Sequence, residues 1–121
     1  MHELSVCLAL LDQVQSIARE HAATGVERIL LHVGPLSGIE PPLLKNAYPL
    51  AAAGTVAEGA ALEIELIPVK VRCNECGAET TVAPNRHVCG QCGGFRTRVI
   101  SGDEMLLANL ELRVPDGHDD G

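Results

Sequence analysis

The chain is poor in aromatic residues: it contains no tryptophan, one phenylalanine (Phe95) and one tyrosine (Tyr48). Hydrophobic residues nevertheless make up 46% of its 121 positions. A hydrophobic core is therefore possible, but it has to be packed with Leu, Ile, Val and Ala. At this length the chain can form one compact domain, or a small core with an additional metal-held lobe.

Basic residues are also scarce, because nine Lys and Arg stand against sixteen Asp and Glu, and the formal net charge is −7. Proteins that bind duplex nucleic acid depend on many cationic contacts to phosphates. We therefore expect no nucleic-acid partner, although a group of basic residues near the cysteines is a local exception. These residues are Lys70, Arg72, Arg86, Arg96 and Arg98.

Targeting and membrane-spanning signals are missing too. The first residues have no cationic stretch ahead of an apolar core, and no apolar run approaches the roughly 20 residues of a spanning helix. Of the five cysteines, four form two C-x-x-C pairs, which suits a metal site in a reducing compartment better than a disulfide framework. We expect a cytoplasmic protein that does not contact membranes.

Hydrophobic periodicity predicts two helices and three strands. Apolar residues recur on one helical face over residues 4–23, namely at Leu4, Leu8, Leu11, Val14 and Ile17/Ala18. Pro41 and Pro42 suit the first turn of a second helix over residues 43–53, which Pro49 is expected to kink or shorten. Strand-forming residues occupy 26–33, 62–66 and 104–112.

The order of these elements is helix, strand, helix, strand, cysteine-rich segment, strand. It predicts an α+β fold: a small mixed three-stranded sheet with two helices, plus an inserted four-cysteine lobe like a zinc ribbon. The expected domains are an α+β domain of residues 1–68 and 101–114, and a metal-binding lobe of residues 69–100. Residues 115–121 are expected to form a flexible tail.

The cysteine spacing carries the strongest chemical signal in the sequence. Cys73, Cys76, Cys89 and Cys92 form two C-x-x-C pairs separated by twelve residues. Each pair can direct two thiolates at one ion, and two pairs complete a tetrahedron of soft ligands. A glycine follows the second cysteine of each pair, so that the chain can turn while backbone N–H groups approach the sulfurs.

Four protein ligands leave no open coordination position, which favours a structural zinc ion over a catalytic one. An iron centre for electron transfer would use the same ligands and stays an alternative. His87, two residues before Cys89, could tune such a site, but an exposed neighbour is the simpler interpretation. Cys7 lies among leucines of the first helix and is expected to be a small core residue.

His2 directly follows Met1, which allows a second metal site. A terminal amine, the amide nitrogen of His2 and its imidazole can form fused chelate rings around Ni(II) or Cu(II) in square-planar geometry, and Glu3 can add a further ligand. On these residues alone, an exposed histidine without a metal role is the simpler interpretation.

The assembled segments resemble the HypA/HybF family of hydrogenase maturation factors. The resemblance is carried by Met-His-Glu-Leu-Ser at residues 1–5, by Leu-His-Val-Gly-Pro-Leu-Ser-Gly-Ile-Glu-Pro at 31–41 and by Gly-Thr-Val-Ala-Glu-Gly-Ala-Ala-Leu at 54–62. The two cysteine pairs and Ser-Gly-Asp-Glu at 101–104 complete it. It extends from Met1 to about Val114.

The resemblance implies a nickel metallochaperone. It assigns nickel, the transferred cargo, to Met1, His2 and Glu3, and structural zinc to Cys73, Cys76, Cys89 and Cys92. It further implies a HypB-type GTPase and the large subunit of [NiFe]-hydrogenase as partners, and a monomer or weak homodimer. Some members of the family also serve urease.

Two features depart from the family pattern. Pro49 falls where an uninterrupted helix is expected, and the acidic tail around His118 has no counterpart. A solvated tail is the simpler interpretation of His118, with a weak extra metal site as the alternative. We find no Ser/His/Asp set or phosphate-binding loop and expect no enzyme activity; the competing hypothesis is a zinc-ribbon interaction module without nickel transfer.

Overall fold

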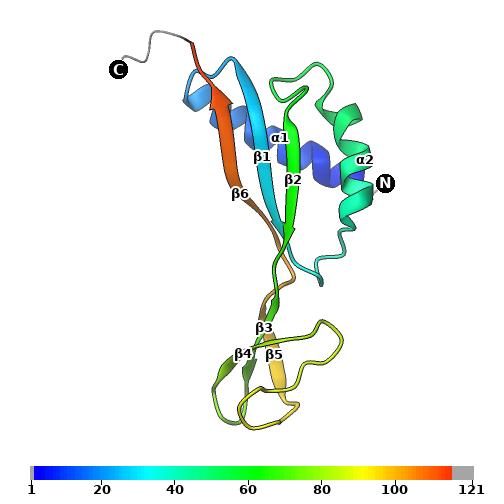
Figure 1. Ribbon diagram of the computed structural model, residues 1–121, viewed down its shortest axis with the longest axis vertical. Coiled ribbons are helices and arrows are strands. Elements are labelled where there is room, and N and C mark those ends of the chain that lie inside the picture. Colours follow the sequence, from blue (N-terminus) through cyan, green and yellow to red (C-terminus); the bar gives the residue numbers. More distant parts are fainter. Residues whose placement is uncertain (1, 116–121) are drawn as a thin grey trace. The chain divides into compact units, whose positions relative to one another are not determined.

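The computed structural model describes residues 2–115, apart from the side chain of His2. These residues divide into two compact units, of which the first comprises 2–31, 40–64 and 107–115 and the second comprises 32–39 and 65–106. The elements, labelled in Figure 1, are α1 (His2–Glu20), β1 (Gly25–Val33), α2 (Pro41–Ala52), β2 (Ala61–Leu66), β3 (Val69–Cys73), β4 (Glu79–Val82), β5 (Thr97–Ser101) and β6 (Met105–Arg113).

The first unit is built on a three-stranded sheet in the order β2-β1-β6. In Figure 1, β1 and β2 point the same way and β6 runs against them, so the sheet is mixed, as predicted. Two parallel neighbours need a crossover connection, and α2 provides it between β1 and β2. Together with the second, cysteine-bearing unit, this arrangement confirms the predicted α+β fold.

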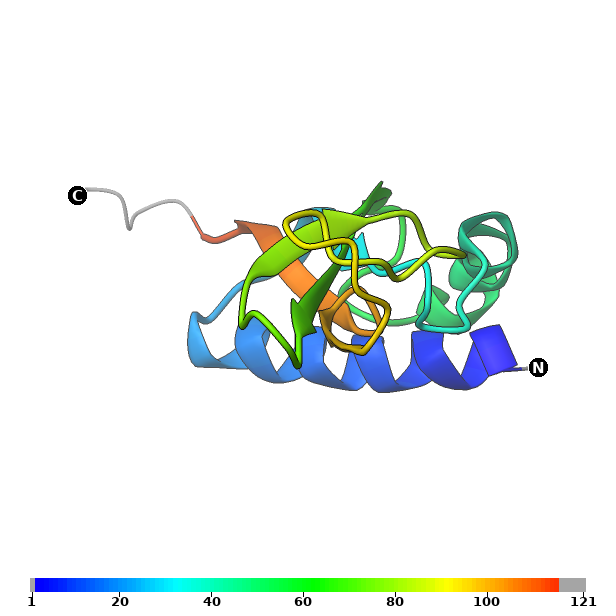
Figure 2. The same cartoon turned by 90° about the horizontal axis from the view of Figure 1, so that it is seen from below.

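Helix α1 is an unbroken helix that packs against α2, which lies near its N-terminal end (Figure 2). Its buried face differs from the predicted one, because Leu8 is 53% exposed. Cys7 and Leu10 are buried instead of Leu8. Together with the buried residues that follow them, they still keep the three- and four-residue spacing of one helical face. The buried residues of α1 are Cys7, Leu10, Leu11, Val14 and Ala18.

Helix α2 begins at the two prolines, with Pro41 and Pro42 in the first turn, as predicted. The expectation that Pro49 would shorten the helix is wrong, because α2 continues through Pro49 to Ala52. Proline removes one backbone hydrogen bond, but Pro49 lies on the exposed side of α2. The buried residues Leu44, Tyr48 and Ala52 hold the opposite side of the helix against the core.

The core of the first unit is aliphatic, as the composition requires. Ile29 and Leu31 of β1 are fully buried, while the intervening outward face of β1 carries Arg28. Arg28 forms ion pairs with Glu63 of β2 at 2.9 Å and Glu111 of β6 at 3.1 Å. One face of the sheet is therefore packed and the other is charged.

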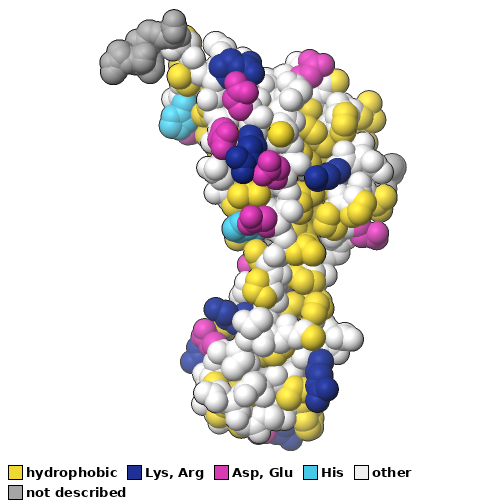
Figure 3. Space-filling model, in the orientation of Figure 1, with side chains coloured by type: hydrophobic (Ala, Val, Ile, Leu, Met, Phe, Trp, Pro, Cys, Tyr) yellow, Lys and Arg dark blue, Asp and Glu magenta, His cyan; other side chains and the backbone are white. Residues whose placement is uncertain are grey.

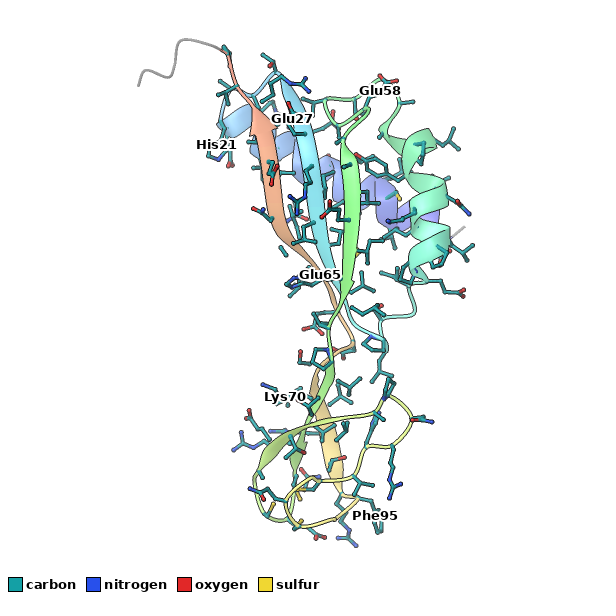
Figure 4. The ribbon with its side chains drawn as sticks, in the orientation of Figure 1. His21, Glu27, Glu58, Glu65, Lys70 and Phe95 are labelled. Atoms are coloured by element: carbon teal, nitrogen blue, oxygen red, sulfur yellow. The ribbon has the colours of Figure 1, made fainter. Side chains whose placement is uncertain are left out.

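The second unit contains an antiparallel sheet in the order β4-β3-β5. Its strands are four or five residues long, and no strand was predicted at any of these positions. Val69 and Val71 of β3 are buried on the face that also bears Cys73. Phe95, in contrast, is 80% exposed and points away from the loop that carries it (Figure 4).

Two backbone segments of the second unit approach closely at Gly34 and Gly102. A Cβ atom on Gly34 would lie 2.0 Å from the carbonyl oxygen of Gly102. The Leu36 N–H donates to the same carbonyl, and the Gly34 N–H donates to that of Glu104. Glycine at position 34 is therefore required by space.

No helix within residues 2–115 is long and apolar enough to cross a membrane.

Candidate metal centre

The four cysteine thiols predicted to bind one ion converge in the second unit. Their sulfur atoms lie within 4.8 Å of one another, and the Cys73–Cys92 and Cys76–Cys89 pairs of sulfurs are each 3.6 Å apart. A tetrahedral zinc site with Zn–S bonds of about 2.3 Å requires sulfurs about 3.8 Å apart. The arrangement therefore fits a tetrathiolate site for one metal ion.

Each pair of cysteines lies on a tight turn in which the first sulfur accepts two backbone N–H groups. Cys73 Sγ accepts from Glu75 N at 3.3 Å and from Cys76 N at 3.4 Å. Cys89 Sγ accepts from the N–H groups two and three residues further along, at 3.3 Å and 3.5 Å. These donors stabilise negative charge on the sulfurs and orient them toward a common centre.

Glycines make the two turns possible. Gly77 and Gly93 have φ angles of +78° and +76°, and the N–H of each donates to the carbonyl of the first cysteine in its pair, at 3.0 Å. This confirms the expected role of the glycine after each pair. Gly94 was not foreseen: a Cβ atom there would lie 3.3 Å from Cys92 Sγ and 3.2 Å from Glu75 Oε1, so glycine lets the backbone pass close to the sulfur.

The hydrogen bonds divide the thiols into two classes. The N–H groups of Cys76 and Glu75 lower the pKa of the Cys73 thiol, and those of Cys92 and Gln91 lower the pKa of Cys89 to about 6. The Gly94 N–H acts in the same direction on Cys92, but hydrogen bonds from the other thiols outweigh it and raise the pKa of Cys92 to about 12. The first cysteine of each pair is thus the more acidic of the two, and a bound cation would favour the thiolate form of all four.

Two other residues singled out in the sequence lie apart from the cluster. His87 Nε2 is 2.7 Å from the Pro84 carbonyl oxygen, and His87 is not among the clustered ligands. Cys7 is fully buried in the first unit, where its thiol donates to the Leu44 carbonyl at 3.6 Å. Burial, with a smaller contribution from Glu3, raises the pKa of the Cys7 thiol, in keeping with a core residue.

Of the predicted nickel residues, His2 and Glu3 are the first two residues of α1. Met1 and the side chain of His2 lie outside the described part of the structure, as does His118. Glu3 is half-buried and borders a shallow hollow of about 350 Å³ in the first unit. The hollow is otherwise lined by Leu4, Leu43, Asn46, Ala47 and Leu50, and Figure 3 shows hydrophobic side chains gathered over α2.

The sequence of the chain matches a family model over residues 1–112, and that model is described as "Hydrogenase/urease nickel incorporation, metallochaperone, hypA". The chain belongs to the HypA family. It is 50% identical to the hydrogenase maturation factor HypA of Nitrosospira multiformis, over 93% of this chain and 97% of that protein. It is 40% identical to HypA of Aquifex aeolicus, over 94% and 99% of the two chains.

Solved structures of HypA proteins share the fold. The solution structure of the Ni metallochaperone HypA from Helicobacter pylori has a TM-score of 0.73 and 25% identity, covering 93% of this chain and 98% of that one. A second HypA solution structure has a TM-score of 0.74 and 26% identity, covering 95% and 98%. Both the sequence and the fold therefore place this chain in a family of nickel metallochaperones for hydrogenase maturation, with a four-cysteine metal site.

Proposed function

We propose that this chain is a nickel carrier that binds Ni(II) through Met1, His2 and Glu3 and helps insert it into the large subunit of [NiFe]-hydrogenase. The observation that carries the proposal is the match to the HypA family, which begins at residue 1 and so includes Met-His-Glu. In this role the protein performs no catalysis, and nickel is its cargo.

The chemistry of the first residues supports the nickel assignment. The terminal amine and the amide nitrogen of His2 are separated by one residue's backbone, and the His2 imidazole closes a second chelate ring. Ni(II) favours such nitrogen ligands in square-planar geometry, and it promotes deprotonation of the amide. An ion held at a chain terminus can be approached by a recipient from several directions, which suits release.

Zinc is proposed as the resident ion of the cysteine cluster. Cys73, Cys76, Cys89 and Cys92 would hold it, and zinc would supply four metal–sulfur bonds that fold the short strands of the second unit. The closed tetrathiolate set leaves no position for a substrate, so the zinc site and the nickel site would have separate tasks.

The proposal includes two protein partners, a HypB-type GTPase and the hydrogenase large subunit, in keeping with the maturation-factor family. It places the protein in the cytoplasm, where a reducing environment keeps thiols available to a metal.

Isothermal titration of the untagged, zinc-loaded chain with Ni(II) tests the nickel site. We expect one nickel per chain, and at least about a tenfold loss of affinity in His2→Ala, because the imidazole closes one of the chelate rings. His21→Ala is the matched control, since His21 lies at the other end of α1 and is exposed. A His2→Ala variant that binds nickel as tightly as the parent would leave only a zinc-ribbon interaction module.

A second measurement tests the amine itself. Two residues added before Met1 move the amine away from His2 and should weaken nickel binding, while the zinc content stays at one ion per chain. Equal nickel affinity with and without the extension would show that the amine is not a ligand.

A further inference from the structure

The outward face of the β4-β3-β5 sheet carries an unusual concentration of positive charge. Along β3, Val69, Val71 and Cys73 are buried and the alternate residues, Lys70 and Arg72, are exposed. Side chains alternate between the two faces of a strand, so both cations stand on the face opposite the metal cluster. Figure 4 shows Lys70 extending outward from β3.

The strand register adds a third cation directly beside these two. Arg72 is paired across the sheet with Arg98 of β5 on one side and with Glu79 of β4 on the other. Side chains directly opposite on neighbouring strands lie about 4.5–5.5 Å apart at Cβ, and like charges in such a pair are destabilising. A folded sheet that keeps two arginines opposite each other therefore retains an unfavourable contact.

One carboxylate compensates part of this charge. Glu79 Oε2 accepts from Arg72 Nη1 at 3.1 Å. In the part of the chain that the structure describes, no carboxylate lies within ion-pair distance of Lys70 or Arg98. Glu104 is near this face through Ser101, which pairs with Lys70. Both of its oxygens are already hydrogen-bonded, to the Gly102 N–H at 2.7 Å and to the Ser101 hydroxyl at 3.3 Å.

The charge of this face contrasts with that of the whole chain. The second unit contains five basic and five acidic residues, so the net charge of −7 comes entirely from the remainder. Figure 3 shows basic side chains with an acidic one between them on the flank of this unit. Ile100 of β5, 40% exposed, adds an apolar contact beside the cations.

We propose that this basic face, formed by Lys70, Arg72 and Arg98, docks an extended acidic segment of a protein partner. Lys70 and Arg72 are two residues apart, a separation of about 7 Å along the strand, which matches carboxylates at alternate positions of an extended peptide. Arginine binds carboxylates through two parallel hydrogen bonds, so each contact is charge-assisted. The inference does not depend on nickel transfer.

Nucleic acid fits this face less well than an acidic peptide. Three cations make few phosphate contacts, the face has no aromatic side chain on which a base could stack, and the chain as a whole is acidic. The three side chains match the spacing of single carboxylates. They do not match the continuous charge of a phosphate backbone.

The test uses the full, zinc-loaded chain and a synthetic nine-residue peptide with glutamate at alternate positions and serine between. NMR titration should shift the backbone amides of β3 and β5, and the affinity should fall as salt is added. The double substitution Lys70→Gln with Arg98→Gln should weaken binding by roughly tenfold or more. The control Arg19→Gln with Lys45→Gln changes the net charge equally in the first unit and should leave the affinity within about twofold.

Weaker binding by a variant could also result from misfolding, so a variant expected to bind more tightly is tested as well. Glu79→Gln removes the carboxylate that competes for Arg72 and should tighten peptide binding, with the zinc content unchanged.

The proposal is overturned by absence of binding at millimolar peptide, or by equal weakening in the control pair. It is also overturned by tighter binding of a single-stranded DNA of equal charge. Self-association without peptide that the Lys70/Arg98 double variant abolishes would assign the face to a second copy and likewise overturn it.

Discussion

The first unit buries aliphatic side chains from two helices and a sheet, whereas the second unit buries three valines and gathers four thiols around one point. Among the described residues, the fully buried set of the first unit includes Val14, Ile29, Leu31 and Leu44. The second unit has no helix among its described residues, and its short antiparallel sheet carries two turns whose cysteines converge on one point.

This difference shows two ways of compensating the conformational entropy lost on folding. The first unit relies on removing apolar surface from water, and each large buried side chain contributes about 1.5–3 kcal/mol. The second has too little apolar surface for that, so metal–sulfur bonds have to contribute the largest share. The two units should therefore respond to different perturbations.

The largest effect should follow removal of the metal. Binding of structural zinc contributes apparent free energies of about 10–16 kcal/mol at pH 7, so chelation or Cys89→Ser should unfold the second unit. An amide NMR spectrum should lose the dispersed signals of β3, β4 and β5 and keep those of α1 and α2. Cys7→Ala is the control and should retain full zinc. Loss of the helix signals together with the zinc would show that the two units do not fold independently.

The next effect concerns the aliphatic core. Leu44→Ala removes a fully buried side chain of α2 and should lower the free energy of unfolding of the first unit by roughly 2–5 kcal/mol. Leu43→Ala, at a neighbouring position that is 44% exposed, should change it by less than about 0.5 kcal/mol. Denaturant unfolding followed by helix circular dichroism measures both, and metal analysis should find zinc unchanged. Equal effects of the two substitutions would contradict the assigned helix face.

A smaller effect should come from the close approach of Gly34 to Gly102. Gly34→Ala places a Cβ atom against a backbone carbonyl, and forced repacking of this kind costs about 1–3 kcal/mol. The matched control is Gly38→Ala in the same segment, where no atom lies within 4 Å but φ is +81°, so the backbone cost of about 1–2 kcal/mol applies without a steric clash. Thermal unfolding of the zinc-loaded chains compares them, and a Gly38→Ala variant less stable than Gly34→Ala would refute the steric argument.

The smallest effect should come from the charged face of the first sheet. Arg28→Gln removes ion pairs with Glu63 and Glu111, all three side chains being 40–49% exposed. Exposed pairs contribute about 0.2–1 kcal/mol, so a loss of about 0.5 kcal/mol is expected, and it should shrink in high salt. Lys45→Gln, which removes a cation without an ion pair among the described residues, is the control. A loss that persists in high salt would point to packing of the arginine stem instead.

The sequence predicted the first unit well because its signals are local. The apolar period and the paired prolines located both helices, and strand-forming runs located β1, β2 and β6 to within a residue or two. Leu8 was assigned to the wrong face because Leu4, Leu8 and Leu11 also repeat at helical spacing. Only contact with α2 and the sheet decides which stripe of α1 is buried.

In the second unit, the convergence of the four cysteines was predictable and the strands were not. C-x-x-C spacing is local, and the glycine after each pair is a direct consequence of the turn it has to make. Strands β4 and β5 are too short for a clear alternation. Strand β3 does alternate, with Val69, Val71 and Cys73 buried, but its five residues adjoin the first cysteine pair and were assigned to the cysteine-rich segment. Arg72 and Arg98 lie opposite each other because of the register between β3 and β5, and no local pattern in the sequence reveals that register.

The two cysteine turns lie in separate stretches of the chain. Each contributes two thiols to a cross-link that forms only when a metal ion is bound. If that ion is zinc, as proposed, a cell short of zinc would hold this protein with the first unit folded and the second unit accessible to proteases. Under the proposed function, the abundance of the protein would then follow the zinc supply, although the metal it delivers is nickel.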